Sequence, residues 1–448
     1  MKRRNFVKSV AALPALGFAG CASNDLFKDN AKCQAKFDGV VVGGGTAGTI
    51  AALQSARLGA KTLVVERSSQ LGGTMTTAGV NFPGLFHINE KQIIAGIGWE
   101  LVCKAVKENS DSLPEFKKQD RHWKNQIRVN DYLYVCLAEE ELLKANAEIL
   151  YYSYPEKIEE TSNGYRLYLS SSFGKGCVFA KKVIDCTANA SAAALAGYER
   201  MREPRRSPGT LVFRIGNFNL KDVDLKAVRK NYNEAVAQGK LGKKDIWTSI
   251  EHLISGRGEN CLYVKDADNS TPLAFSKSNI LGRKILLGIF RFLKTQKGLE
   301  NVKMEMIKTE VGVRETYKIV GEKVMSIEEY ASGKLFSDSL CYSYYPIDLH
   351  DVNGLKTIHL KEGVSPAIPL SILTPKGAKN MLVAGRCASA DRFANSAMRV
   401  QASCMAMGQV AGCVSALAAL KNIGNTQLDL NYVRKTLKAN NAIVPPEV

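Results

Sequence analysis

Asp38-Gly-Val-Val-Val-Gly43-Gly-Gly45-Thr-Ala-Gly48 is the stretch that decides the fold of this chain. Apolar residues 40–42 predict a short buried strand, the glycines predict a tight turn, and the alanine-rich run behind them predicts a helix. Gly43 allows the chain to reverse, Gly45 allows a pyrophosphate to approach the backbone, and Gly48 allows close packing of helix and strand. The N–H groups and positive dipole end of the helix favour a bound phosphate.

A second predicted strand, Lys61-Thr-Leu-Val-Val-Glu66, follows the helix and ends in a carboxylate. Glu66 lies eighteen residues after Gly48, where such an acid reaches a ribose hydroxyl in nucleotide-binding domains. Because strand, turn, helix, second strand and acid follow in the required order, we predict that this segment binds a nucleotide. The alternative is an α/β domain that has kept the turn and has no ligand.

The 448 residues exceed one typical domain, so two lobes are expected. The composition is 45% hydrophobic and 23% charged, with a formal net charge of +18. The basic residues are spread widely and form no aromatic-interleaved stripe, so we expect no nucleic acid partner. Anionic lipid headgroups or an acidic protein would be attracted by the same field. After the N-terminal region, no segment is expected to reach the ~18 uncharged apolar residues that span a bilayer.

Eleven cysteines are present, and none of them forms a C-x-x-C pair or another metal-ligand spacing. We therefore expect no metal site and no iron–sulfur cluster, because cluster ligands usually lie close together in sequence. Most of the cysteines have apolar neighbours, which favours buried free thiols over disulfides.

The first residues resemble a targeting signal. A basic start, an apolar run over residues 7–18 and the following small residues fit a signal peptide. The Arg3-Arg4 pair followed by Phe6 resembles the twin-arginine signal, which exports folded proteins. Phe18-Ala-Gly-Cys21 resembles a bacterial lipobox with Cys21 as the lipidated residue, although Phe18 stands where leucine is usual. The alternative is the uncleaved apolar N-terminus of a cytosolic protein.

A second glycine-rich segment, Arg67-Ser-Ser-Gln-Leu-Gly72-Gly73-Thr74, follows Glu66 directly. With this glycine pair after the acid, the sequence resembles the FAD-dependent oxidoreductases of the glutathione-reductase-type flavoprotein superfamily. The resemblance covers roughly residues 37–443. It implies that Gly72 and Gly73 hold the phosphates and ribityl chain of FAD. It also favours FAD over NAD, because NAD sites usually lack the pair.

Two further segments of the first lobe match that family in part. Residues 80–98 resemble the loop on the substrate side, which would place His87 beside the flavin as an acid/base. A structural histidine bonded to backbone is the alternative. Lys182-Val-Ile-Asp185-Cys-Thr-Ala188-Asn189 resembles the segment that closes over FAD, where the usual pattern is Ala-Thr-Gly-Asp. Ala188 and Asn189 depart from that pattern, which indicates a change in detail rather than loss of the site.

The predicted second lobe contains two polar motifs. Val313-Arg314-Glu315-Thr316 and Tyr344-Tyr345-Pro-Ile-Asp348-Leu-His350 resemble family signatures and are expected to line the substrate cavity opposite the flavin. Arg314 could bind an anion or polarise a carbonyl, and His350 could carry a proton. A structural ion pair between Arg314 and Glu315 is the alternative.

Residues 280–293 place Arg283, Lys284 and Arg291 on an apolar background. A basic amphipathic helix of this kind could lie on a membrane surface near a lipid anchor. We favour a packed helix with a solvated basic edge, because the family has a helix at this place.

The chain is then expected to return to the first lobe. Asn380-Met-Leu-Val-Ala-Gly385-Arg386 resembles the strand and turn that complete the FAD site. The stretch from Ser396 to Gly412, which includes Arg399 and Val400, resembles the closing helix of the family. The N-terminus of that helix would stabilise negative charge on the reduced flavin.

We therefore predict an α/β fold with a three-layer, Rossmann-like FAD/NAD(P)-binding domain and an inserted β-rich α+β substrate domain. The predicted parts are a signal peptide (1–20), a tether (21–36), the first part of the FAD domain (37–200), the substrate domain (201–365), the closing part of the FAD domain (366–425), and a C-terminal helix and tail (426–448).

The predicted function is two-electron transfer between a small organic substrate and non-covalently bound FAD, in an exported enzyme of the bacterial cell envelope, periplasmic or membrane-anchored through a lipid on Cys21. Because no second dinucleotide fingerprint is present, a quinone or an envelope redox protein is the expected electron partner. The alternatives are an NAD(P)-linked dehydrogenase and a flavin-carrying lipoprotein without substrate turnover. The candidate catalytic residues are His87, Arg314, Tyr345 and His350, and the candidate cofactor-binding residues are Gly43, Gly45, Thr46, Ala47, Gly48, Glu66, Arg67, Gly72, Gly73, Thr74, Gly385, Arg386, Arg399 and Val400.

Overall fold

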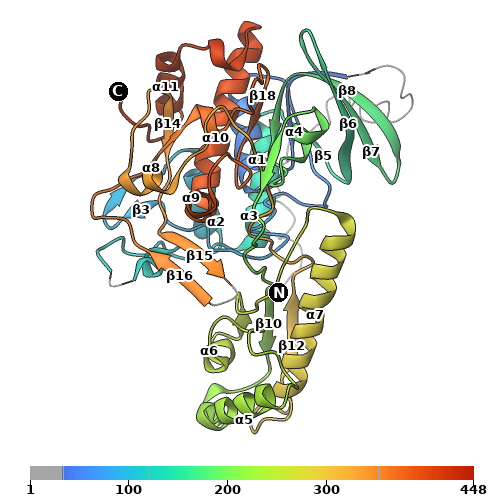
Figure 1. Cartoon of the computed structure of the whole chain (residues 1–448), viewed down its shortest axis with the longest axis vertical. Coiled ribbons are helices and arrows are strands. Elements are labelled where there is room, and N and C mark those ends of the chain that lie inside the picture. The colour runs from blue at the N-terminus through green and yellow to red at the C-terminus, as the bar shows by residue number, and fades with distance from the viewer. Residues whose placement is uncertain (1–32, 34, 120, 352–353) are drawn as a thin grey trace, which may run out of the picture.

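A seven-stranded sheet forms the centre of the molecule (Figure 1). The computed structural model describes residues 33, 35–119, 121–351 and 354–448. The strands of the sheet are β1 (Ala35–Val42), β2 (Thr62–Val65), β5 (Glu148–Leu150), β6 (Ser153–Thr161), β7 (Gly164–Ser171), β8 (Gly174–Asp185) and β18 (Met381–Val383). The parallel part has the order β5-β2-β1-β8-β18, so the late strand β18 joins the early strands along β8. The start of β8 also pairs antiparallel with β7, which pairs with β6. The predicted signal peptide and Cys21 lie outside the described residues.

Two cores lie on opposite faces of this sheet because its parallel strands are apolar on both sides. Val41 and Val64 face one core, while Val40 and Val65 face the other, as strand alternation requires. Helices cover the first core. The second core lies between the parallel strands and the antiparallel strands β6 and β7, whose apolar residues pack against those of β1, β2 and β18. These three layers confirm the predicted α/β, Rossmann-like fold. The helices of this lobe are α1 (Thr46–Arg57), α2 (Ile97–Glu108), α3 (Asp131–Lys144), α4 (Ser191–Leu195), α9 (Arg392–Met398), α10 (Gln401–Lys421) and α11 (Leu430–Ala439).

By length and composition alone, α10 could span a membrane. The expectation that no segment after the N-terminal region is long and apolar enough to do so is therefore wrong. In the fold, 94% of its apolar window is buried inside the protein. Gly408 and Gly412 face α1, where a Cβ atom would come within 2.3 and 2.2 Å of the carbonyl oxygens of Ala47 and Ala51. α10 is therefore a core helix that packs directly on α1.

A second lobe is inserted between the two parts of the first, and Figure 1 shows it at one end of the molecule. β10 (Phe213–Gly216) pairs antiparallel with β11 (Gly258–Glu259) and β12 (Lys303–Ile307). Helices α5 (Leu225–Ala237), α6 (Ile250–Ser255) and α7 (Pro272–Leu293) share one apolar core with this sheet and contribute more residues than its strands. β9 (Arg200–Arg202) pairs with β13 (Tyr317–Ile319) where the chain enters and leaves.

The chain after β13 returns to the first lobe before residue 365. Tyr330 of α8 (Ile327–Ser332) and Leu340 of β14 (Ser339–Tyr342) belong to the same core as α1 and α10. β14 pairs with β17 (Ala367–Pro369), and the hairpin of β15 (Ile347–Asp351) and β16 (Gly354–Ile358) lies against α9. The remaining short elements are β3 (His87–Ile88), β4 (Lys91–Gln92), η2 (His122–Asn125), η3 (Leu220–Asp222), η4 (Leu370–Ile372) and η5 (Asn425–Gln427).

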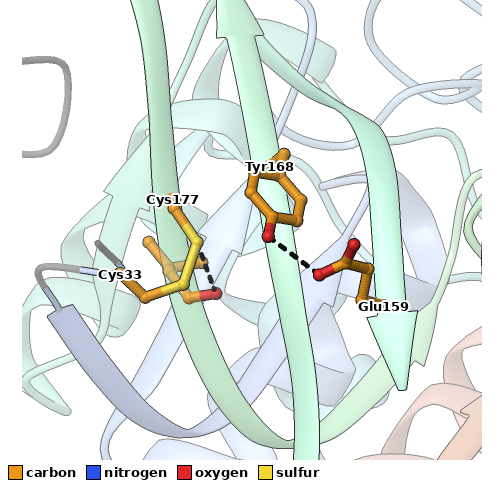
Figure 2. Close-up of a disulfide and its surroundings, with 5 residues drawn as sticks. Cys33, Glu159, Tyr168 and Cys177 are labelled. Carbon is orange, nitrogen blue, oxygen red and sulfur yellow. Dashed lines mark hydrogen bonds between the residues drawn. A yellow bond between two sulfur atoms is a disulfide. The ribbon is translucent and has the colours of Figure 1, made fainter. Parts of the chain in front are cut away.

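Cys33, just before β1, forms a disulfide with Cys177, near the start of β8 (Figure 2). The expectation that free thiols would account for the cysteines is wrong for this pair. The parallel register sets Ala35 opposite Val178 and brings the two cysteine Cα atoms to 4.4 Å, although 144 positions separate them in sequence. That register is a tertiary property, and neither cysteine has a local pattern that reveals it. The remaining described cysteines are free thiols, and most of them are buried.

Replacing Cys177 with serine is expected to lower the free energy of unfolding by about 2–5 kcal/mol, because the disulfide restricts the unfolded chain over a long loop. Thermal unfolding with and without reductant measures this effect, and non-reducing peptide mapping identifies the crosslink. Cys136→Ser, at an exposed free thiol, is the matched control and should leave the melting temperature unchanged. Equal melting temperatures for wild type and Cys177→Ser under oxidising conditions would contradict a stabilising disulfide.

Candidate active site

The turn between β1 and α1 has room only for glycine at two of its predicted positions. Gly43 has a φ of +95°, and a Cβ there would lie 2.7 Å from the carbonyl oxygen of Cys186. A Cβ on Gly48 would lie 1.8 Å from the carbonyl oxygen of Gly43. The predicted sharp reversal at Gly43 and close packing at Gly48 are therefore confirmed.

Gly45 differs from these two because it borders open space. It precedes the first turn of α1 with a φ of −65° and makes no side-chain cap hydrogen bond. No atom lies within 4 Å of a Cβ built on Gly45. The start of a 12-residue helix, with its N–H groups and positive dipole end, thus faces free volume next to a residue without a side chain. This is the backbone arrangement that accepts a phosphate.

The second glycine segment closes one side of this turn. The Gly72 N–H donates to the Gly44 carbonyl at 2.9 Å, and the Thr46 hydroxyl donates to the Gly72 carbonyl at 3.1 Å. A Cβ on Gly73 would lie 3.0 Å from the Cα of Gly45. Gly72, Gly73 and the turn therefore form one continuous backbone surface, here called the glycine cradle (residues 43–48 and 72–73). Thr74 follows it, half-buried.

Glu66 holds the glycine cradle in shape from the end of β2. Its carboxylate accepts hydrogen bonds from the Gly44 N–H at 2.7 Å and the Ser68 N–H at 2.8 Å. A carboxylate has further lone pairs, so the predicted contact with a ribose hydroxyl is compatible with these bonds. Arg67 makes an ion pair with Glu310 of the second lobe at 2.8 Å.

The late part of the chain meets the glycine cradle. The side-chain oxygen of Gln401, the first residue of α10, lies 3.1 Å from the Thr46 hydroxyl, whose single proton is shared between this oxygen and the Gly72 carbonyl. A Cβ on Gly385 would lie 3.3 Å from the Cβ of Ala47. Val400 lies beside the loop that contains Gly84. Segments more than 300 positions apart in sequence therefore converge on one site, as the sequence predicts.

Arg386 connects the two lobes. Its guanidinium donates to the carbonyl oxygen of Ala188 at 3.1 Å and to that of Val313 in the second lobe. Asn189 makes a similar link, because its side-chain amide donates to the Asn269 carbonyl at 2.9 Å. Ala188 has a φ of +66°, in the left-handed region where the family pattern has glycine. The departures from that pattern thus occur where the chain forms bonds between the lobes.

A polar cluster of Tyr263, Arg314, Asp348, His350 and Arg399 lies at the junction of the second lobe with α9 and α10. The Tyr263 hydroxyl lies 2.8 Å from His350 Nδ1, and His350 Nε2 lies 3.0 Å from the Asp348 carboxylate. Arg399 donates to the backbone carbonyl of Asp348 at 3.3 Å. The Arg314 guanidinium lies 5.9 Å from the centre of the Tyr263 ring. The structure thus brings together three predicted site residues, and adds Tyr263 and Asp348.

Burial sets the protonation states in this polar cluster. It lowers the pKa of His350 to about 4, and the positive charge of Arg314 acts in the same direction. Burial, with the charge of Arg399, also lowers the pKa of Arg314 to about 10, which leaves it charged at neutral pH. For Asp348, burial favours a higher pKa, but the hydrogen bond from His350 and the two arginine charges bring it below its usual range. We therefore assign neutral His350 between a carboxylate and a tyrosine.

His87 lies apart from the polar cluster, whereas Tyr345 lies beside it, close enough for the charges of Asp348 and Arg399 to act on the pKa of its hydroxyl. The His87 ring stacks on Phe116 with 3.7 Å between centroids and meets the edge of Trp99 at 5.2 Å. Its Nδ1 is buried and has no hydrogen-bond partner among the described residues. The Tyr345 hydroxyl accepts from the Gln126 amide at 2.9 Å, and its ring lies beside Gly84. These contacts describe a histidine in an aromatic environment and a tyrosine near the start of α10.

The two buried histidines predict a loss of stability in acid. Burial lowers the pKa of His87, like that of His350, to about 4, whereas an unfolded histidine titrates near 6.5. The unfolded chain therefore binds more protons between these values, so stability is complete above about pH 6.5 and declines as the pH falls toward 4, by on the order of 2 kcal/mol per histidine. Thermal melts across this range measure it.

His87→Phe keeps the ring stack on Phe116 and removes one titrating group, so its melting temperature should depend less on pH than that of the wild type. His252→Gln, at an exposed histidine, is the control and should reproduce the wild-type curve. Identical pH dependence in wild type and His87→Phe would show that His87 does not titrate in this way.

Solved structures that resemble this chain are distant in sequence. They include a geranylgeranyl bacteriochlorophyll reductase-like protein from Thermoplasma acidophilum (14% identity, TM-score 0.42, 91% of this chain and 82% of that chain). Others are p-nitrophenol 4-monooxygenase PnpA from Pseudomonas putida (12%, TM-score 0.43, 91% and 89%) and a flavoprotein/dehydrogenase from Cytophaga hutchinsonii (14%, TM-score 0.41, 91% and 84%). No curated protein matches the chain.

A protein family described as FAD dependent oxidoreductase matches residues 38–437. The match includes the glycine cradle, the polar cluster and the start of α10. The cradle fits the cofactor of that family, because the open helix start at Gly45 and the adjacent Gly72–Gly73 pair offer backbone to a pyrophosphate without side chains in the way. The chain therefore belongs to the FAD dependent oxidoreductase family, and its cofactor is FAD.

Proposed function

We propose that this protein transfers two electrons between a small organic substrate and non-covalently bound FAD, and that the substrate binds at the polar cluster. One observation carries the proposal: Gln401 bonds the glycine cradle through Thr46, while Arg399, two residues earlier, bonds Asp348 of the polar cluster. A single turn of chain therefore joins the cofactor side of the site to the side with acid/base groups. We also propose that the family belongs to the glutathione-reductase-type superfamily, as the Gly72–Gly73 pair suggests.

When bound, FAD supplies the two-electron chemistry, and the polar cluster would supply binding and proton transfer. Arg314 and Arg399 each make one hydrogen bond among the described residues, in both cases to a backbone carbonyl. A guanidinium has five N–H donors, so both can bind an oxygen of a carboxylate or carbonyl substrate. Such contacts fix the orientation of the substrate and offset negative charge that develops on it.

Proton transfer would use Tyr263, His350 and Asp348. If the Asp348 carboxylate accepts from His350 Nε2–H, then Nδ1 is free to accept from the Tyr263 hydroxyl. A substrate proton can pass to the Tyr263 oxygen as the hydroxyl proton passes to Nδ1. Asp348 orients the imidazole and stabilises its charged form. His350 thus acts through Tyr263, since both of its ring nitrogens are hydrogen-bonded.

An anaerobic screen of small hydroxy acids, keto acids and sugars tests this function. Substrate-dependent bleaching of the yellow flavin absorbance is the expected result. The absence of a second dinucleotide fingerprint in the sequence suggests a quinone, an envelope redox protein or another small molecule as the second electron partner. Rapid reduction of the bound flavin by NAD(P)H would contradict that assignment, and a flavin that no small molecule bleaches would contradict substrate turnover.

We further propose that the protein is exported to the bacterial cell envelope. The Arg3-Arg4 and Cys21 patterns suggest it, and the Cys33–Cys177 disulfide supports it, because disulfides persist mainly in oxidising compartments. Cell fractionation of wild type and Arg3→Lys/Arg4→Lys tests the proposal. Wild type should be found in the envelope and the variant in the cytoplasm, and the same location for both would contradict twin-arginine export.

A further inference from the structure

α7 carries positive charge without any acidic residue. Between Asp268 and Glu300 the chain has no Asp or Glu, and it has six basic residues: Lys277, Arg283, Lys284, Arg291, Lys294 and Lys297. The helix itself is 22 residues long, which corresponds to about 33 Å. Among the described ion pairs of the protein, none uses a basic residue of this segment. No acidic residue in the described part of the chain therefore pairs with the positive charges of α7.

The two faces of α7 differ in what they contact. Leu286, Ile289 and Leu293 are buried in the core of the second lobe. On the opposite face, Leu273 is 65% exposed, Ile280 is 62% exposed and Leu287 is 47% exposed. These three residues are seven positions apart, so they form one line along the helix.

Lys277, Lys284 and Arg291 lie in that same line. Each follows one of the exposed aliphatic residues by four positions, which places it on the same face of the helix. We call these six residues, Leu273, Lys277, Ile280, Lys284, Leu287 and Arg291, the α7 stripe. Figure 1 shows α7 along the outer side of the second lobe. All six residues of the stripe are exposed.

A solvated basic edge accounts for the lysines but not for the aliphatic residues between them. Single exposed aliphatic side chains are ordinary on protein surfaces. On α7, three exposed aliphatic side chains form a line with three cations. This differs from scattered single residues, because each leucine or isoleucine is adjacent to a long cationic side chain. Lysine and arginine can extend their charged ends away from apolar surroundings while their stems remain among them. That combination suits an interface that is apolar inside and anionic at its edge.

We propose that the α7 stripe binds the surface of a lipid bilayer that contains anionic lipids. The leucine and isoleucine side chains enter the boundary between headgroups and acyl chains, and the basic residues contact the anionic headgroups. An acidic protein would satisfy the charges, but it offers no reason for alternating aliphatic residues and cations. The inference is independent of the proposed redox reaction and of lipidation at Cys21, and it would hold the second lobe against the membrane.

Vesicle sedimentation tests this proposal with the full chain carrying Cys21→Ser, so that no lipid is attached. One variant combines Lys277→Glu, Lys284→Glu and Arg291→Glu. The matched control combines Lys226→Glu, Lys230→Glu and Lys240→Glu, which changes the net charge equally at exposed residues of the same lobe. With vesicles of phosphatidylcholine and phosphatidylglycerol, the α7 variant should bind at least about 100-fold more weakly than the chain that carries Cys21→Ser alone, and the control should remain close to that chain.

A second variant, Leu273→Ser/Ile280→Ser/Leu287→Ser, separates insertion from charge attraction. It should also bind more weakly, and its residual binding should be abolished by salt. Unchanged melting temperature and FAD content show that both variants are folded. Equal losses in the α7 variant and its control would show a general charge effect and overturn the proposal. Vesicle binding that neither α7 variant weakens would overturn it as well.

Discussion

Replacing Gly45 with valine is expected to lower the affinity for FAD by at least about 100-fold, or about 2.7 kcal/mol, without unfolding the protein. Gly45 has a φ that any residue adopts, and apart from Gly45 and its chain neighbours no described atom lies within 4 Å of a Cβ at this position. The protein itself therefore tolerates the side chain. The FAD pyrophosphate does not, because the open volume at Gly45 is the space that it needs. Flavin release followed by FAD titration of the apoprotein measures the affinity.

Gly39→Ala is the matched control for this experiment. Gly39 lies on β1, six residues before Gly45, and a Cβ there would make an ordinary contact of 3.5 Å with the Ser55 hydroxyl. Its FAD affinity should equal that of the wild type. A Gly45→Val protein that retains FAD with wild-type affinity would show that the pyrophosphate binds elsewhere.

Replacing His350 with glutamine is expected to slow substrate-dependent bleaching of the flavin by roughly 10²- to 10⁴-fold, the usual contribution of acid/base groups. Glutamine can bond neighbours but cannot take up a proton. Tyr263→Phe should cause a similar loss, because it removes the hydroxyl 2.8 Å from His350. If the two residues act as one unit, the double variant should be little slower than either single variant. Anaerobic stopped-flow absorbance with a substrate from the screen measures the rate.

His252→Gln, at an exposed histidine of α6, is the control and should bleach at the wild-type rate. FAD content distinguishes a role in proton transfer from a role in structure. If His350→Gln loses FAD in proportion to activity, its role is structural. If it bleaches at the wild-type rate, the polar cluster does not transfer the proton.

Much of the cofactor side could be predicted from the sequence because glycine patterns report local geometry. Gly43 and Gly48 stand where a Cβ would collide with backbone carbonyls. Only glycine fits at such positions, so they can be recognised in the sequence. The pairing of the early turn with the start of α10 was predictable only through the family resemblance. The contacts of Gly408 and Gly412 with α1 give that pairing a physical cause.

The rest depends on contacts between distant segments. Tyr263 lies in the plain apolar run Cys261-Leu-Tyr-Val264, and only the fold places its hydroxyl beside His350. The partner of Arg67 is likewise set by the position of the second lobe, which supplies Glu310. The Cys33–Cys177 pair follows from strand register. None of these relations has a spacing in sequence that could reveal it.

The surface of α7 is a second case in which the sequence alone was not sufficient. The sequence reveals its basic residues, and the family resemblance predicts a packed helix. Only the fold shows that Leu273, Ile280 and Leu287 are exposed on the same face as the charges. A helix can thus be packed on one side and still offer a binding surface on the other.

A crystal structure of the protein with FAD bound tests the central claim most directly. We predict that the pyrophosphate contacts the backbone of residues 43–48 beside Gly72 and Gly73, and that the cofactor extends toward residues 399–401 and the polar cluster. FAD bound in a different cleft, or with its pyrophosphate away from the start of α1, would contradict the account.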